Sequence, residues 1–266
     1  MLTNLFNQKK RKMLARTLDC CVIRRFLLPV ELRWLINAYF LATLDNATIY
    51  FAVSYFCSND NRKKNVVLKS YGFIEWWDTS HITNMSFLFF NQLYFNKNIS
   101  RWDVSNVHAM SEMFYGAARF NQPIGKWDVS NVKDMQGMFE EAEDFNQPLH
   151  EWNVSNVITM NRMFHSAYLF NQPLGKWDVS NVITMSEMFA SARYFNQPLS
   201  NWNVSNVTTM FLMFNEARAF NQSINEWEFV DTRNVMRMFD YASSYNQPLL
   251  GKWQIVGHKS NNPFLD

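Results

Sequence analysis

The sequence predicts an α/β solenoid: a stack of about seven 25-residue coils, each with a short parallel strand and a short helix, behind a helical N-terminal cap. The period of 25 residues is marked by Trp77, Trp102, Trp127, Trp152, Trp177, Trp202 and Trp227. Twelve residues after each Trp comes a Phe, at Phe89, Phe114, Phe139, Phe164, Phe189, Phe214 and Phe239. A Met column keeps the same step, at Met85, Met110, Met135, Met160, Met185 and Met210.

Stacking follows from the small size of one unit. A unit of 25 residues cannot bury its own apolar face, whereas stacked units share a continuous core and contact only their neighbours. Equivalent apolar residues are therefore expected to lie above one another. The first and seventh units depart from the pattern, for example at Thr79, Lys97, Val230 and Asp231. Atypical terminal units are typical of capping coils.

The unit that begins at Leu149 shows the elements expected in each coil. Trp152 and Val154 alternate with polar residues, which predicts a short strand. The apolar positions from Val157 to Phe164 recur every three or four residues, which predicts a turn or two of helix. The segment 171–173, Asn-Gln-Pro, predicts a return turn because Pro cannot continue a helix. At about 4.8 Å per parallel strand, seven coils would span roughly 34 Å.

Polar residues repeat as faithfully as the apolar ones. Serines recur at Ser80, Ser105, Ser130, Ser155, Ser180 and Ser205, and asparagines at Asn96, Asn121, Asn146, Asn171, Asn196, Asn221 and Asn246. Ser and Asn side chains hydrogen bond to nearby backbone groups and stabilise turns. We interpret these columns as structural ladders, because a residue repeated in every coil serves the stack. The alternative is that the Asn columns bind a ligand or an ion.

The composition divides the chain into three segments. Residues 1–70 form a basic helical segment, residues 71–252 the repeats, and residues 253–266 a partial repeat and tail. The first 70 residues hold twelve Lys and Arg against four Asp and Glu. This basic segment is either a solvated tail or a contact for RNA, anionic lipid or an acidic partner. The formal net charge of the whole chain, +2, argues against strong steering toward nucleic acid.

Export and membrane insertion are weakly indicated. No convincing secretory signal precedes the apolar stretch near Phe26, and the odd number of cysteines (Cys20, Cys21, Cys57) predicts reduced thiols. We therefore expect an intracellular, cytoplasmic protein. Residues 34–59 contain only one charged residue, Asp45, so a membrane-anchored surface protein is the alternative to a buried helical pair. The polar residues within this stretch favour the helical pair.

The repeated phrases resemble a known family. They are Phe-Asn-Gln-Pro-Leu at 145–149 and Trp-Asp-Val-Ser-Asn-Val at 177–182, followed by Met185 and by Met188-Phe189. They resemble the BspA-like leucine-rich repeats, in the variant common in mycoplasma surface proteins. The resemblance covers about residues 71–253 and implies a leucine-rich-repeat-like solenoid that acts in adhesion or protein interaction. It implies no catalytic residue.

A second resemblance lies in the N-terminal segment. The apolar residues at 32, 35, 36, 39 and 40 fit one helical face. The spacing of Leu28, Pro29, Glu31, Leu32, Ile36 and Tyr39 is similar to the opening of an F-box, and Val53-Ser54-x-Phe56 is similar to its later helix. The resemblance implies docking of residues 28–56 to a Skp-type adaptor of a ubiquitin ligase, with the repeats holding the substrate. The alternative is a helical cap that shields the first coil.

The residues of a catalytic site are not recognisable in the sequence. The five histidines form no metal-ligand cluster with Cys, and no Gly-rich phosphate loop or Gly-x-Ser-x-Gly turn occurs. The Asp that follows Trp in some units is Asn at 153 and 203, which is untypical of an acid–base pair. We expect a protein that is not an enzyme and uses no cofactor or metal.

Binding specificity is expected at positions that differ from coil to coil. Before the Trp column these are Arg101, Lys126, Glu151, Lys176 and Glu226, and near the strand-to-helix turn His108, Lys133 and Arg233. Variation beside fixed columns implies exposure to solvent, and reflects either a binding surface or drift. The function expected is a non-enzymatic protein–protein interaction scaffold, with a ubiquitin-ligase substrate adaptor or a surface adhesin as alternatives. The expected partners are proteins, with no specific nucleic acid and no membrane.

Overall fold

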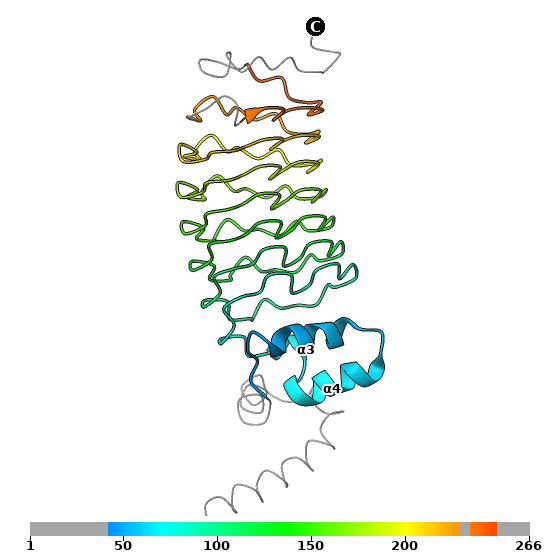
Figure 1. Cartoon of the computed structure of the whole chain (residues 1–266). Coiled ribbons are helices and arrows are strands. Elements are labelled where there is room, and N and C mark those ends of the chain that lie inside the picture. Colours follow the sequence, from blue (N-terminus) through cyan, green and yellow to red (C-terminus); the bar gives the residue numbers. More distant parts are fainter. Residues whose placement is uncertain (1–41, 229–234, 249–266) are drawn as a thin grey trace, which may run out of the picture. The chain divides into compact units, whose positions relative to one another are not determined.

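The computed structural model describes residues 42–228 and 235–248. Within this part, helices α3 (Thr48–Cys57) and α4 (Asn61–Tyr71) and the 3-10 helix η2 (Ile74–Trp76) precede the repeats. The two α-helices and the repeats belong to one compact unit, whose N-terminal boundary lies at Thr43. Figure 1 shows the repeats as coils lying one above the next, with α3 and α4 at the N-terminal end of the stack.

Local sequence signals set the bounds of the helices. The carboxylate of Asp45 accepts hydrogen bonds from the backbone N–H groups of Ala47 and Thr48, just before α3. Asp60 caps α4, where its side chain accepts from the N–H of Arg62 at 2.7 Å. Gly72 ends α4 with a φ of 75°, a conformation that glycine adopts without strain.

Helix α3 covers the first coil. Its buried residues Ile49 and Val53 belong to the same apolar core as the repeats, and Phe56 meets the ring of Trp77 edge-on at 6.1 Å. Asn46, just before α3, accepts a hydrogen bond from the backbone N–H of Thr83 at 2.9 Å. In later coils the equivalent N–H donates to a carbonyl of the preceding coil. No coil precedes the first one, and the side chain of Asn46 supplies the acceptor in its place.

The expected strand and helix in each coil are corrected by the structure. Parallel pairing is reduced to isolated bridges that join Asn84, Ala109, Asp134, Thr159, Thr184 and Thr209 in succession. These bridges lie after the Trp-x-Val segment that was expected to form the strand. In the segment 157–164, which was expected to be helical, Thr159 forms one of these bridges and residues 161–164 form turns. Among the described residues of the repeats there is neither a helix of the α type nor an extended strand.

Hydrogen bonding between coils explains why no helix forms. The N–H groups of Met160, Arg162 and Phe164 donate to the carbonyls of Thr184, Ser186 and Met188 in the next coil, each at 2.9 Å. Those of Val157 and Met163 close tight turns within the coil, onto Val154 and Met160. An α-helix needs all these donors for its own carbonyls. The apolar spacing of three to four residues is therefore produced by a chain of turns.

Left-handed backbone conformations permit these turns and recur in register. The same position of successive coils has φ between 52° and 62° at Phe87, Glu112, Gly137, Arg162, Glu187, Leu212 and Arg237. Such a conformation costs a residue with a Cβ roughly 1–2 kcal/mol. Six of these seven positions carry a side chain, so the bonds to neighbouring coils must offset this strain.

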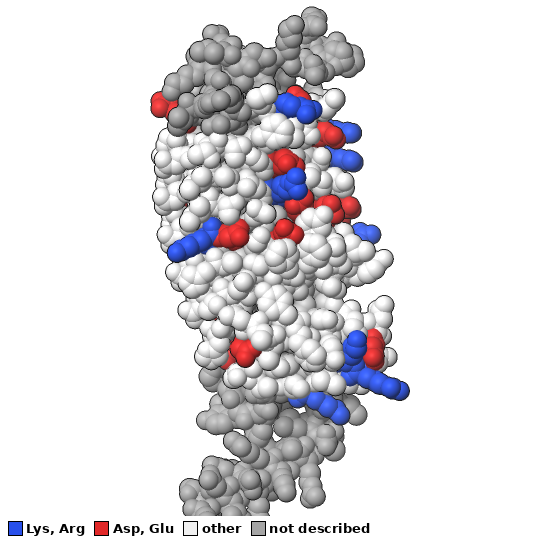
Figure 2. Space-filling view, in the orientation of Figure 1, with Lys and Arg blue, Asp and Glu red and all other residues white. Residues whose placement is uncertain are grey.

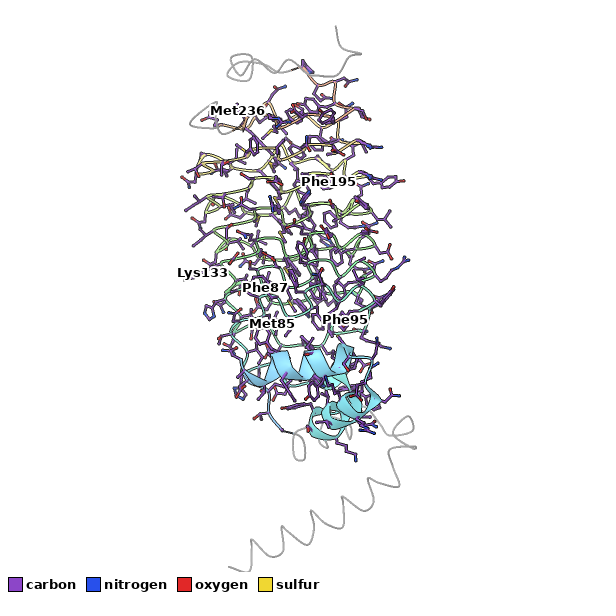
Figure 3. All side chains as sticks on the ribbon, turned by 45° about the vertical axis from the view of Figure 1, so that its right-hand side comes forward. Met85, Phe87, Phe95, Lys133, Phe195 and Met236 are labelled. Carbon is purple, nitrogen blue, oxygen red and sulfur yellow. The ribbon has the colours of Figure 1, made fainter. Side chains whose placement is uncertain are left out.

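The core consists of aromatic columns. Consecutive rings of the Phe89-to-Phe239 column lie 5.4–5.7 Å apart, and those of the Phe95-to-Tyr245 column 5.8–6.1 Å. Figure 3 shows Phe95 and Phe195, four coils apart, one above the other. Each buried Trp from Trp102 to Trp227 donates its indole N–H to a carbonyl of the preceding unit at 2.8–3.2 Å. The polar atom of each Trp is thereby satisfied inside the core.

The Asn column forms a ladder at the edge of the core. The side-chain oxygen of Asn146 accepts from the backbone N–H of Asn171 at 3.0 Å and from Nε2 of Gln172 at 2.9 Å. The same pair of bonds repeats at each step from Asn96 to Gln247. The interpretation of this column as structural is confirmed, because the carbonyl oxygens of these amides are used within the stack.

Candidate interaction surface

Part of the predicted site lies outside the described residues. This holds for the whole F-box-like set, Leu28, Pro29, Glu31, Leu32, Ile36 and Tyr39, and for Arg233. Of the later F-box-like residues, Val53 is buried in the core and Phe56 packs on Trp77. Both side chains serve the contact between α3 and the first coil.

The column that precedes Trp is exposed at every described position. It comprises Arg101, Lys126, Glu151, Lys176 and Glu226. The guanidinium of Arg101 lies 4.1 Å from the ring centre of Trp76 in η2, which is the geometry of a cation–π contact. The column carries charges of both signs and forms no single-sign surface.

The second predicted column runs beside the parallel bridges. His108 and Lys133 are exposed, and the backbone N–H of Lys133 donates to the carbonyl of His108 at 2.9 Å. In Figure 3 Lys133 projects at the edge of the stack. The next two positions of the column are Ile158 and Ile183, whose side chains are 43% and 44% exposed. The column therefore changes from charged to apolar within four coils.

Two further columns vary more strongly, and the sequence reasoning missed them. They are Phe87, Glu112, Gly137, Arg162, Glu187, Leu212 and Arg237, and Phe90, Tyr115, Glu140, His165, Ala190, Asn215 and Asp240. We call these two columns the variable face. Both columns have a signal in the sequence. The residue two positions after the first Met of each unit changes from unit to unit, and so does the residue directly after the Phe of the Phe89-to-Phe239 column.

Charged groups on the variable face pair mostly between neighbouring coils. Arg162 lies 3.0 Å from a carboxylate oxygen of Glu187, and this hydrogen bond raises the pKa of Arg162. Nδ1 of His165 lies 3.1 Å from a carboxylate oxygen of Glu140, which is 6% exposed. Partial burial, followed by the charge of Glu140, raises the pKa of Glu112. Figure 2 shows charged side chains in small groups with wide uncharged surface between them.

The described residues present little reactive chemistry. They contain no group of three or more His, Cys, Asp or Glu side chains that could hold a metal ion. Burial raises the pKa of Cys57 to about 11, so its thiol stays protonated at neutral pH. Among the helices of the described part of the chain, none has both the length and the apolar character that a membrane span requires.

These features define a repeat protein whose interior is periodic and whose surface varies. The chain belongs to the family described as Mycoplasma protein of unknown function, DUF285, which matches residues 58–174 and, in a second overlapping match, residues 148–253. The family match thus covers the repeats and part of the helical segment before them. No curated protein and no solved structure matches the chain.

Proposed function

We propose that the chain is a non-enzymatic protein–protein interaction scaffold, a solenoid of the BspA-like leucine-rich repeat type. The observation that carries the proposal is the variable face, whose residues differ from coil to coil beside an interior that changes little. Four of them, Phe87, Phe90, Arg162 and Arg237, are exposed, and most of the others are partly exposed. A rigid stack holds such side chains at fixed distances, and repeat proteins use extended surfaces of this kind for binding. The match to a repeat family supports the same conclusion.

The test is capture of partners by the full chain from extracts of the source cells. One variant carries Arg162→Ala, Leu212→Ala and Arg237→Ala on the variable face, and a matched control carries Lys126→Ala, Lys176→Ala and Tyr194→Ala at exposed positions outside it. We expect specific partners that are retained by the control and lost by the variant, with both variants as folded as the parent. Partners retained equally by both variants, or no specific partner at all, would contradict the proposal.

A substrate adaptor of a ubiquitin ligase is the second candidate, and the Leu28-Pro29-x-Glu31-Leu32 phrase supports it. Because Val53 and Phe56 are used by the stack, docking would depend on residues 28–39. Binding of the full chain to a Skp-type protein should be lost in Leu28→Asp and kept in Lys126→Ala. If the parent chain does not bind, the scaffold acts without this adaptor.

A further inference from the structure

Exposed aromatic rings gather at the N-terminal end of the variable face. Phe87 and Phe90 are 51% and 37% exposed, and their ring centres lie 5.9 Å apart. The ring of Phe90 stacks on that of Tyr115 in the next coil at 4.7 Å. We call these three residues the aromatic patch. Exposed rings in contact with one another mark an interaction site more often than isolated apolar residues do.

The fold does not require aromatic residues at these positions. The positions equivalent to Phe87 carry Glu112, Arg162 and Glu187 in later coils, and the turn has the same left-handed conformation there. The positions equivalent to Phe90 and Tyr115 carry Glu140 and then other polar or small residues. The aromatic patch is therefore a feature of the first two coils that the fold does not impose.

Carboxylates border the patch on the side of the third coil. Burial raises the pKa of Tyr115, and the charges of Glu141, Glu140 and Glu112 raise it further, with no cation among the causes. The hydroxyl of Tyr115 donates to a carboxylate oxygen of Glu141 at 3.3 Å. The edge of the aromatic patch therefore lies in a negative field.

Gly137 lies between two of these carboxylate side chains. A Cβ at this position would lie 3.0 Å from Cγ of Glu112 and 3.2 Å from a carboxylate oxygen of Glu140. Gly137 and Glu140 are themselves buried, so the carboxylates within reach of a partner are those of Glu112, which is partly exposed, and Glu141, which is exposed. The guanidinium of Arg162 lies 3.0 Å from a carboxylate oxygen of Glu187, and its charge also lowers the pKa of Glu112 against the larger effect of burial.

The geometry points to a binding site for a polypeptide segment that carries an apolar side chain for the aromatic patch and a Lys or Arg for the carboxylates of Glu112 and Glu141 at its edge. This inference rests on the proposed function as an interaction scaffold. Ring spacings of 5.4 and 5.6 Å separate the first, second and third coils, so Phe90 and Glu141 are offset by about 11 Å along the stack. An extended chain advances about 3.3 Å per residue, so the two partner residues should be about three positions apart. Desolvated aromatic anchors give affinity, and charge complementarity gives specificity.

The experiment is selection of peptides from a random display library on the full chain. We expect enrichment of an aromatic or aliphatic residue followed about three positions later by Lys or Arg. The affinity of a synthetic peptide with this sequence, measured by fluorescence anisotropy, should weaken as salt is raised. Phe87→Ser with Phe90→Ser should weaken binding about tenfold or more. Glu112→Gln with Glu141→Gln leaves every buried aromatic residue in place and should weaken binding about tenfold.

The controls are Lys126→Ala and Tyr194→Ser, which remove an exposed charge and an exposed ring elsewhere. Equal affinity of the patch variants and the controls, or selected peptides without a basic residue, would overturn the inference. Self-association that Phe90→Ser abolishes, seen by sedimentation of the full chain, would also overturn it and identify a second copy as the occupant. If no peptide is enriched while the extract experiment still captures partners, this inference fails and the proposed function stands.

Discussion

The interior of the stack and its variable face follow opposite rules. Inside, each position keeps one residue type or a similar one from coil to coil, and the side-chain polar atoms of Trp152 and Asn146 bond to neighbouring coils. On the variable face, equivalent positions range from Phe87 through Gly137 to Arg162. Because each coil contacts only its neighbours, identical interior contacts are enough to hold the stack. The difference teaches that the residues that hold the stack are separate from those that the proposed function assigns to recognition.

Removal of one interior Trp should have the largest effect. Trp152 is 3% exposed, and its indole N–H donates to the carbonyl of Ile124 at 3.1 Å. Trp152→Ala should lower the free energy of unfolding by about 3–5 kcal/mol, measured by denaturant titration, because it leaves a cavity and an unpaired carbonyl. Trp152→Phe keeps a ring but loses the donor and should cost less. A change within about 0.5 kcal/mol for the Ala variant would contradict the buried column.

Removal of one rung of the Asn ladder should have the next largest effect. Asn146→Ala deprives the N–H of Asn171 and the amide of Gln172 of their acceptor. An unsatisfied buried donor costs about 1–3 kcal/mol, and these groups are partly buried, so we expect a loss near the lower end. Hydrogen exchange should rise at Asn171 more than at equivalent N–H groups in distant coils. Unchanged protection at Asn171 would show that water replaces the rung without cost.

The period, the interior columns and the structural role of the asparagines could be predicted from the sequence, because each depends on identity between coils. The secondary structure of a coil could not. Val157, Met160 and Phe164 have a helical spacing, but the N–H groups of Met160 and Phe164 donate to the next coil, and single-coil periodicity holds no information on bonds between coils. The variable face could not be recognised from variation alone, because the exposure of its positions depends on the turns that the chain forms after Met160. The pairing of Glu140 with His165 depends on register between coils and had no signal within one unit.

Gly137 belongs to the variable face and also forms a left-handed turn of the stack, so its replacement tests whether a residue of the variable face affects stability. Gly137→Ala should destabilise the chain by about 1–2 kcal/mol, because a Cβ is disfavoured at a φ of 56° and would press on Glu112. Ser191→Ala, at a left-handed position that already carries a Cβ, is the matched control and should change stability by less than about 0.5 kcal/mol. Thermal unfolding of both variants measures the difference. Equal melting temperatures would mean that the turn relaxes around the new methyl group.

Exposed charges should have the smallest effect on stability. Lys133→Ala and Lys176→Ala should each change the free energy of unfolding by less than about 0.5 kcal/mol, because both side chains are exposed and the backbone bond from Lys133 to His108 does not depend on the side chain. Denaturant titration beside Trp152→Ala gives the comparison within one chain. A loss above about 1 kcal/mol at either lysine would show that the exposed columns also hold the stack, and variation there could then not be interpreted as freedom for recognition.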